Sequence, residues 1–299
     1  MNIHELNKNF GKANEFDFFQ DNHGLIAVKI KNKVAEATIM LYGAHVLSYK
    51  PINQKELLWM SRTSFFEVGK PIRGGIPVCF PWFGPNPNDS NLPIHGFARL
   101  KNWSLLNTES LNNGSSSLIL GIESNEETLT IWPHPFKATI EFIVGNELSV
   151  KLTINNIGDN SFICTNALHS YFNISNVDNV NLHGLSECEY SNSLNNGAIE
   201  KQEENLLLIN KELNRRYINH AGATLIEDKL WARTINVAKL NSKITVVWNP
   251  WVETTKKMTD MTADAYKSFV CIEAANTLDD SIEVNPGATH TLGTIISIK

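Results

Sequence analysis

The sequence has few cysteines and no grouping of them that would bind a metal or cross-link a fold. Four cysteines occur in 299 residues, at Cys79, Cys164, Cys188 and Cys271, and none belongs to a C-x-x-C pair. Three of them lie inside apolar runs, where cysteine packs as a small hydrophobic side chain. The pattern therefore argues against a disulfide framework and against a cysteine-based zinc site.

Signals for a membrane, for export or for nucleic-acid binding are missing as well. The longest apolar run is shorter than 18 residues, and the N-terminal segment lacks a basic region followed by an apolar one. The formal net charge is −5, from 26 Lys and Arg against 31 Asp and Glu, without a basic block. We therefore expect a cytoplasmic monomer with neither a membrane nor a nucleic-acid partner.

Several common catalytic motifs do not occur. The sequence contains no G-x-S-x-G, no P-loop, no G-x-G-x-x-G before a helix and no H-E-x-x-H. Its nine histidines are scattered, so a metal site would need ligands from distant parts of the chain. We expect neither a cofactor nor a metal ion, and serine hydrolysis loses support.

What the sequence does contain is alternation of apolar and polar residues with a period of two, the signature of β-strands. Such stretches, separated by Gly, Asn and Ser turns, cover residues 24–51, 103–124, 136–174, 232–251, 268–276 and 288–299. Three strands are expected within 136–174, and amphipathic helices are few. With 42% hydrophobic residues, the chain is predicted to form an all-β sandwich or barrel in one domain, with a surface loop at Ser191–Asn205.

His169 lies in the stretch CTNALHSYFNI, which is predicted to be one of these strands. On a strand, Ala167, His169 and Tyr171 share one face, and both faces are largely apolar, so the imidazole should be enclosed. An enclosed histidine is either a core residue bonded to a backbone carbonyl or a general acid, because its pKa lies near neutrality. The residues alone leave both interpretations open.

Glu273 ends an apolar run in the stretch SFVCIEAAN, on the same predicted strand face as Phe269 and Cys271. A carboxylate in such surroundings is costly to bury unless it is paired. One interpretation is a structural salt bridge. The other is a partly desolvated carboxylate with a raised pKa, which would suit a general base.

Two arginines lie among glycines, prolines and aromatic residues. Arg73 precedes two glycines, which allow a ligand to approach the backbone closely, and Arg99 follows His95 by four residues. In an extended conformation, Arg99 and His95 would point in the same direction. A guanidinium group binds phosphate or carboxylate with fixed geometry, so either a ligand or the protein's own carboxylates would be the partner.

Five motifs in order, RGGIPVCFPWFGP, LPIHGFAR, ALHSYF, VVWNPW and CIEAAN, closely resemble the hexose-6-phosphate mutarotases (glucose-6-phosphate 1-epimerases). These enzymes are a branch of the aldose 1-epimerase family, and the resemblance runs from about Gly24 to the C-terminus. It implies a large antiparallel β-sandwich of the galactose-mutarotase type. The chain is then a single domain over residues 1–299, with residues 1–23 as an N-terminal extension.

The resemblance also implies roles for individual residues. His169 matches the family's catalytic histidine, and Glu273 matches its catalytic glutamate. Arg73 and Arg99 match arginines that hold the sugar phosphate, and His95 matches a histidine that contacts the sugar. The implied partner is therefore a small sugar phosphate.

Two positions depart from the pattern of similar proteins. Asn214 stands where relatives tend to have the aspartate of an Asp-Arg-x-Tyr segment. Its amide can still accept a hydrogen bond from a sugar hydroxyl, but it carries no charge. Ile94 stands before the histidine of HGFAR, where some relatives have a polar residue. Both departures concern sugar preference, and Asn214 is expected to contact the substrate.

The implied reaction exchanges the α and β anomers of a hexose 6-phosphate, with glucose 6-phosphate as the expected substrate. Glu273 would take the proton of the C1 hydroxyl while His169 protonates the ring oxygen, and reclosure reverses these roles. Three alternatives share the fold: an aldose 1-epimerase for unphosphorylated sugars, a sugar-binding protein without catalysis, and a carbohydrate lyase or hydrolase.

Overall fold

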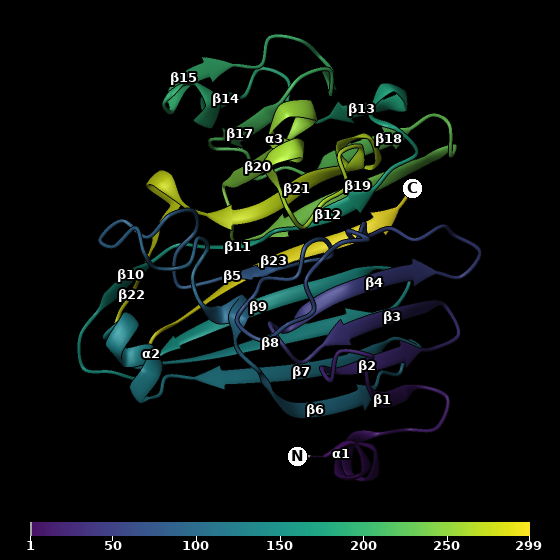
Figure 1. The fold of residues 1–299 in the computed structure, drawn as a ribbon, viewed down its shortest axis with the longest axis vertical. Coiled ribbons are helices and arrows are strands. Elements are labelled where there is room, and N and C mark those ends of the chain that lie inside the picture. The colour runs from purple at the N-terminus through teal and green to yellow at the C-terminus, as the bar shows by residue number, and fades with distance from the viewer. Residues whose placement is uncertain (1) are drawn as a thin grey trace.

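Antiparallel pairing joins the strands into four sheets in the computed structural model, which describes residues 2–299. Every pairing between named strands is antiparallel, as the period-two pattern of the sequence predicts. Helices are short and lie at the periphery (Figure 1). They are α1 (Ile3–Phe10), α2 (Glu126–Ile131) and α3 (Trp251–Lys257).

The N-terminal sheet contains four strands in sequence order, and Figure 1 shows it in purple beside strands β6–β9. Its members are β1 (Phe16–Gln20), β2 (Ile26–Lys31), β3 (Ala35–Met40) and β4 (His45–Pro51). Phe16 and Phe18 on β1 are buried in the main hydrophobic core, and β1 pairs with β2 along its whole length. Within residues 2–23, which belong to the segment that the sequence suggested as an extension, β1 is part of the sheet, and Leu6, Phe16 and Phe18 are part of the main core.

A nine-stranded sheet forms one layer of the sandwich, and long strands with regular alternation dominate it. On β8, for example, every second residue from Phe136 to Val144 is buried. In spatial order the strands are β16 (Leu207–Leu208), β13 (Val180–His183), β18 (Thr224–Asp228), β19 (Arg233–Leu240), β23 (Thr289–Ile298), β9 (Leu148–Asn156), β8 (Phe136–Val144), β7 (Ser116–Glu123) and β6 (Ser104–Ser110).

An eight-stranded sheet forms the facing layer, and it carries Asn214 and Glu273, with His169 between two of its strands. Seven strands follow the order β15 (Ala198–Lys201), β14 (Glu189–Asn192), β17 (Leu213–Tyr217), β20 (Ile244–Asn249), β21 (Phe269–Asn276), β11 (Asn166–Leu168) and β5 (Val78–Cys79), and β12 (Tyr171–Asn173) also pairs with β21. A small sheet of β10 (Phe162–Cys164) and β22 (Ile282–Val284) completes the set.

Strand β21 is buried along its whole length because both of its faces are covered. Val270, Ile272 and Ala274 belong to the main core, on the side where β21 contacts β23 of the facing sheet. Cys271 and Glu273 alternate with them and therefore lie on the outer face of the sheet. The sandwich thus places Glu273 under a cavity instead of in the core.

Two local predictions were wrong. Ser191–Asn205 was expected to be a surface loop, but it contains the end of β14 and all of β15, which pair as a hairpin. Strand β15 lies at the sheet edge and is largely exposed. Backbone pairing holds it in place, and because it has no buried face its sequence shows no alternation of apolar and polar residues. Residues 136–174 hold five strands instead of three, because the segment after β9 divides into β10, β11 and β12.

No helix among residues 2–299 is long and apolar enough to span a membrane.

Candidate active site

The side chains of His169 and Glu273 face each other, with His169 Nε2 3.3 Å from Glu273 Oε1. His169 falls between β11 and β12, which both pair with β21 in one continuous register, so it lies opposite Glu273. The break between the two strands turns backbone groups toward another segment: His169 N–H donates to the carbonyl of Pro77, and Tyr171 N–H donates to that of Gly75. The histidine backbone is therefore fixed from both sides.

A cavity of about 330 Å³ opens over this pair. It contains all six residues that the sequence singles out: Arg73, His95, Arg99, His169, Asn214 and Glu273. Its volume is that of a pocket for a small molecule. Arg73, His169 and Glu273 are far apart in the sequence, and strand pairing brings them together in space.

His169 is almost fully buried. Its ring stacks on Tyr171, with centroids 4.8 Å apart and planes within 10°, and the ring of His95 lies perpendicular to it, with centroids 5.7 Å apart. Burial lowers the pKa of His169 well below its usual value, and the positive charges of Arg73 and Arg99 lower it further. Its Nε2 faces a carboxyl group and not a backbone carbonyl, unlike the core histidine that was the alternative interpretation.

Glu273 is 1% exposed, and its Oε2 has no hydrogen-bond partner among residues 2–299. Burial raises the pKa of this carboxyl well above its usual range, and the charges of Arg216 and Arg99 offset part of the increase. Burial thus disfavours net charge on either member of the pair. Two ionisable side chains this close titrate as a coupled pair, an arrangement suited to acid–base exchange.

Arg73 has a carboxylate partner within the protein. Its Nε donates to Asp260 Oδ2 at 2.9 Å, and its Nη1 donates to the hydroxyl of Tyr171 at 2.9 Å. Of the two interpretations of Arg73, the structure shows the internal ion pair. Because Tyr171 stacks on His169, the hydrogen bond from Arg73 to Tyr171 also helps to fix the position of the imidazole.

Arg99 has no carboxylate partner among residues 2–299, in contrast to Arg73. Its Nη2 donates to the carbonyl of Ile94 at 2.7 Å, and its buried Nε has no partner in the same range. The expected extended run from His95 to Arg99 was wrong: His95 has a φ of +67°, and Arg99 lies in the 3₁₀ helix η1 (Ala98–Leu100). Glycine at position 96 allows this turn, since a Cβ there would lie 2.1 Å from the carbonyl oxygen of Phe80.

His95 presents one ring nitrogen to the cavity. Its Nδ1 accepts a hydrogen bond from the N–H of Gly84 at 3.0 Å, so the proton of the neutral ring resides on Nε2. Burial lowers the pKa of His95 to about 3, and Arg99 contributes to the shift. His95 is therefore a hydrogen-bond donor and not a cation.

Arg216 is a cavity residue that the sequence analysis missed. It lies on β17 with Asn214, and the two side chains share the cavity face, whereas Arg215 points to the other face and bonds to Gln202. On a strand, side-chain alternation counted from Asn214 places Arg215 on the opposite face and Arg216 on the same face. The signal was present in the segment NRRY, but only the strand assignment gives it a direction.

Three ligand-type atoms, from His169, Cys271 and Glu273, lie within 4.8 Å of one another. Around a tetrahedral zinc ion, bond lengths of about 2.0–2.3 Å place ligand atoms only about 3.5 Å apart. Burial also raises the pKa of the Cys271 thiol well above its usual value, which disfavours the thiolate that a metal needs. The group therefore suits proton transfer, and we assign no metal site to it.

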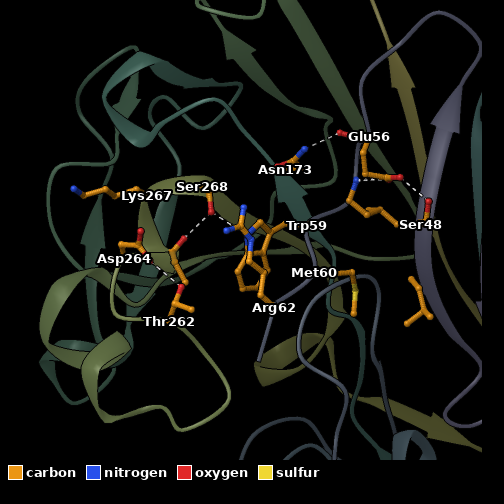
Figure 2. Close-up of a pocket in the computed structure, with 13 residues that line it drawn as sticks. Ser48, Glu56, Trp59, Met60, Arg62, Asn173, Thr262, Asp264, Lys267 and Ser268 are labelled. Carbon is orange, nitrogen blue, oxygen red and sulfur yellow. Dashed lines mark hydrogen bonds between the residues drawn. The ribbon is translucent and has the colours of Figure 1, made fainter. Parts of the chain in front are cut away.

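A larger cavity, of about 480 Å³, lies elsewhere on the molecule (Figure 2). Its lining contains no histidine, and its acidic groups are engaged: Glu56 accepts hydrogen bonds from Ser48, and Asp264 accepts one from Thr262. Trp59 forms part of its wall and donates to Ser268. Without an acid–base pair, this cavity is the weaker candidate for catalysis.

Comparison with known proteins relates most of the chain to one family. The aldose 1-epimerase family model matches residues 27–297. A Salmonella typhimurium protein named "Putative glucose-6-phosphate 1-epimerase" is 35% identical over 246 residues, which cover 82% of this chain and 81% of that protein. A protein of the same name from Cenchrus ciliaris is 33% identical over 259 residues, with coverage of 84% and 78%.

Solved structures give the same relationship for the fold. A crystal structure of a "putative mutarotase (YeaD)" from Salmonella typhimurium matches with a TM-score of 0.88 and 31% identity, covering 95% of this chain and 93% of that one. A galactose 1-epimerase from Lactobacillus acidophilus matches with a TM-score of 0.74 at 14% identity, covering 96% and 99%, a likeness of fold alone. The predicted antiparallel sandwich of the galactose-mutarotase type is thereby confirmed.

Proposed function

The chain belongs to the aldose 1-epimerase family, and on that premise we propose that it interconverts the α and β anomers of a hexose 6-phosphate. Glucose 6-phosphate is the expected substrate. The observation that carries the proposal is the pairing of Glu273 with His169 at 3.3 Å in a cavity that also contains the uncompensated charge of Arg99. The names of the relatives support the phosphate ester as substrate.

The reaction needs one proton to move in each direction. Glu273 accepts the proton of the C1 hydroxyl while His169 donates one to the ring oxygen, and the bond between C1 and the ring oxygen breaks to give an open-chain aldehyde. Rotation about C1–C2 exposes the other face of the carbonyl. Ring closure then returns one proton to O1 and one to His169, so both side chains regain their starting states.

The remaining cavity residues would orient the sugar. His95 donates from Nε2, and Asn214 offers an amide to the hydroxyl groups. Arg99 would hold the phosphate, because its charge is uncompensated, and Arg73 would contribute less, because Asp260 already neutralises it. A cytoplasmic monomer stays a prediction, for which gel filtration and cell fractionation are the tests.

The test is anomer exchange at equilibrium, measured by magnetisation-transfer NMR on glucose 6-phosphate, with glucose and galactose in parallel. Wild type is compared with Glu273→Gln and with Arg62→Gln, a matched control at an exposed residue of the other cavity. We expect faster exchange of the phosphate ester, lost in Glu273→Gln and retained in Arg62→Gln. Faster exchange of free sugars alone would indicate an aldose 1-epimerase for neutral sugars, and no acceleration would leave a sugar-binding protein.

A further inference from the structure

Arg216 is the charged group of the cavity to which the proposed reaction gives no task. Its side chain is half-buried, and its guanidinium carbon lies 6.0 Å from the centroid of the Phe83 ring. Among residues 2–299, no carboxylate lies within 4.0 Å of its nitrogens and no group accepts a hydrogen bond from it. A partly desolvated charge without a partner is costly, so a role for it is expected.

Strand register places Arg216 in line with Glu273. Arg216 on β17 pairs with Val246 on β20, and Val246 pairs with Glu273 on β21. Paired residues of antiparallel strands direct their side chains to the same face, and neighbouring strands lie about 4.8 Å apart. The backbone positions of Arg216 and Glu273 are therefore about 10 Å apart, and the side chain between them in this row is the short, apolar Val246.

The surroundings of the Glu273 carboxyl supply little other charge. The ionisable groups that face it from neighbouring elements are His95, His169, Cys79, Cys271, Tyr171, Arg73 and Arg99. Burial keeps His95, both thiols and the phenol neutral, and His169 is the other member of the acid–base pair. Arg73 is paired with Asp260, so Arg99 and Arg216 are the cations that remain uncompensated.

We propose that Arg216 is a positioning residue whose charge, acting across Val246, favours the ionised form of the Glu273 carboxyl over its protonated form and so favours placement of the shared proton on His169. The proposal rests on the proposed function, because it assigns the base and acid roles within that pair. A charge separation equal to that backbone spacing, about 10 Å, at an effective dielectric constant of about 20, corresponds to a pKa change of roughly one unit. The presence of Arg216 should therefore raise the ratio of ionised to protonated Glu273 about tenfold.

The direct test does not depend on activity. The Glu273 carboxyl is titrated by ¹³C NMR in protein labelled at the glutamate carboxyl carbons, and its signal is identified by its loss in Glu273→Gln. Arg216→Met removes the charge and keeps the length, Arg216→Lys keeps the charge, and Arg62→Met is the matched control at an exposed arginine. We expect the pKa of Glu273 to rise by about one unit in Arg216→Met alone.

An unchanged Glu273 titration in a folded Arg216→Met protein would overturn the proposal. Where exchange is established, the acid limb of the kcat/KM profile should move upward by the same amount in Arg216→Met. A higher KM for the phosphate ester with an unmoved pH profile would instead make Arg216 a phosphate ligand and also overturn it. If no sugar is exchanged, the proposed function fails, while the NMR titration still decides the role of Arg216.

Discussion

Tyr171 lies flat against the imidazole of His169, and the hydroxyl of the same tyrosine accepts a hydrogen bond from Arg73. Arg73 in turn is held by Asp260. The four side chains form a chain of contacts that ends at the ring nitrogen facing Glu273. Arg73, which the sequence suggested as a phosphate ligand, thus has a second task in the orientation of the histidine.

Removal of either member of the acid–base pair should abolish most of the exchange. We expect Glu273→Gln and His169→Gln each to lower kcat for glucose 6-phosphate by about 10²- to 10⁴-fold, the usual contribution of a positioned acid or base. Because the two act as one unit, the double variant should be little worse than either single variant. Magnetisation-transfer NMR measures the rates, and independent, multiplicative losses would contradict the shared proton.

Arg99 should distinguish phosphorylated from free sugars. Arg99→Gln removes a charge-assisted contact, so kcat/KM for glucose 6-phosphate should fall by about 10- to 100-fold, while any exchange of glucose stays unchanged. Arg99→Lys keeps the charge and should retain part of the activity. Equal losses for both sugars would mean that Arg99 maintains the cavity and does not select the substrate.

Breaking the Arg73–Asp260 pair should cost stability. The two side chains are only 19% and 10% exposed, so Asp260→Ala leaves a largely buried arginine unpaired. Removal of one partner from a buried ion pair typically costs about 3 kcal/mol. Urea denaturation measures the loss, with Asp264→Ala as a control because Asp264 is exposed. A stability equal to that of wild type would show that solvent already screens the pair.

Stability should depend on pH through Lys239. Its amino group donates to the carbonyl of His220 and to the hydroxyl of Thr245, and burial lowers its pKa to about 7. Since the unfolded lysine has a pKa of about 10.4, the unfolded chain binds more protons between pH 7 and 10. The contribution of Lys239 to the free energy of unfolding therefore rises across this window and is constant below it.

Urea midpoints measured from pH 6 to pH 10 check this expectation. The difference between wild type and Lys239→Met isolates the lysine, because all other groups are common to both proteins. It should increase in favour of wild type as the pH rises above 7. A flat difference would mean that the amino group titrates alike in the folded and unfolded chains.

Period-two alternation was sufficient to predict the fold class, because half-buried strands such as β8 and β9 carry one polar and one apolar face. It failed for β15, which has no buried face to display. It also failed around His169, where the strand is interrupted without any change in composition. Local pattern thus reveals strands that cover a core and misses strands that only pair.

The six candidate residues could be chosen from the sequence, but their partners could not. Asp260 lies 187 positions after Arg73, in a segment without periodicity, and nothing local predicts the contact. Arg216 required the register of three strands before it could be aligned with Glu273. Long-range contacts of this kind depend on the order of strands in the sheet. The local sequence pattern is compatible with many such orders, so it does not predict the contacts.

The two faces of strand β21 have different surroundings. Ile272 on one face packs in the core, and Glu273 on the other face lines the cavity. Deleting or inserting one residue within it would exchange these faces and carry the carboxyl into the interior. A change in the length of this strand would therefore disturb the core and the cavity together, whereas the loops around the cavity can change length while His169 and Glu273 stay in place. A change of substrate range that keeps Glu273 in the cavity must therefore come from the loops or from substitutions, with the length of β21 unchanged.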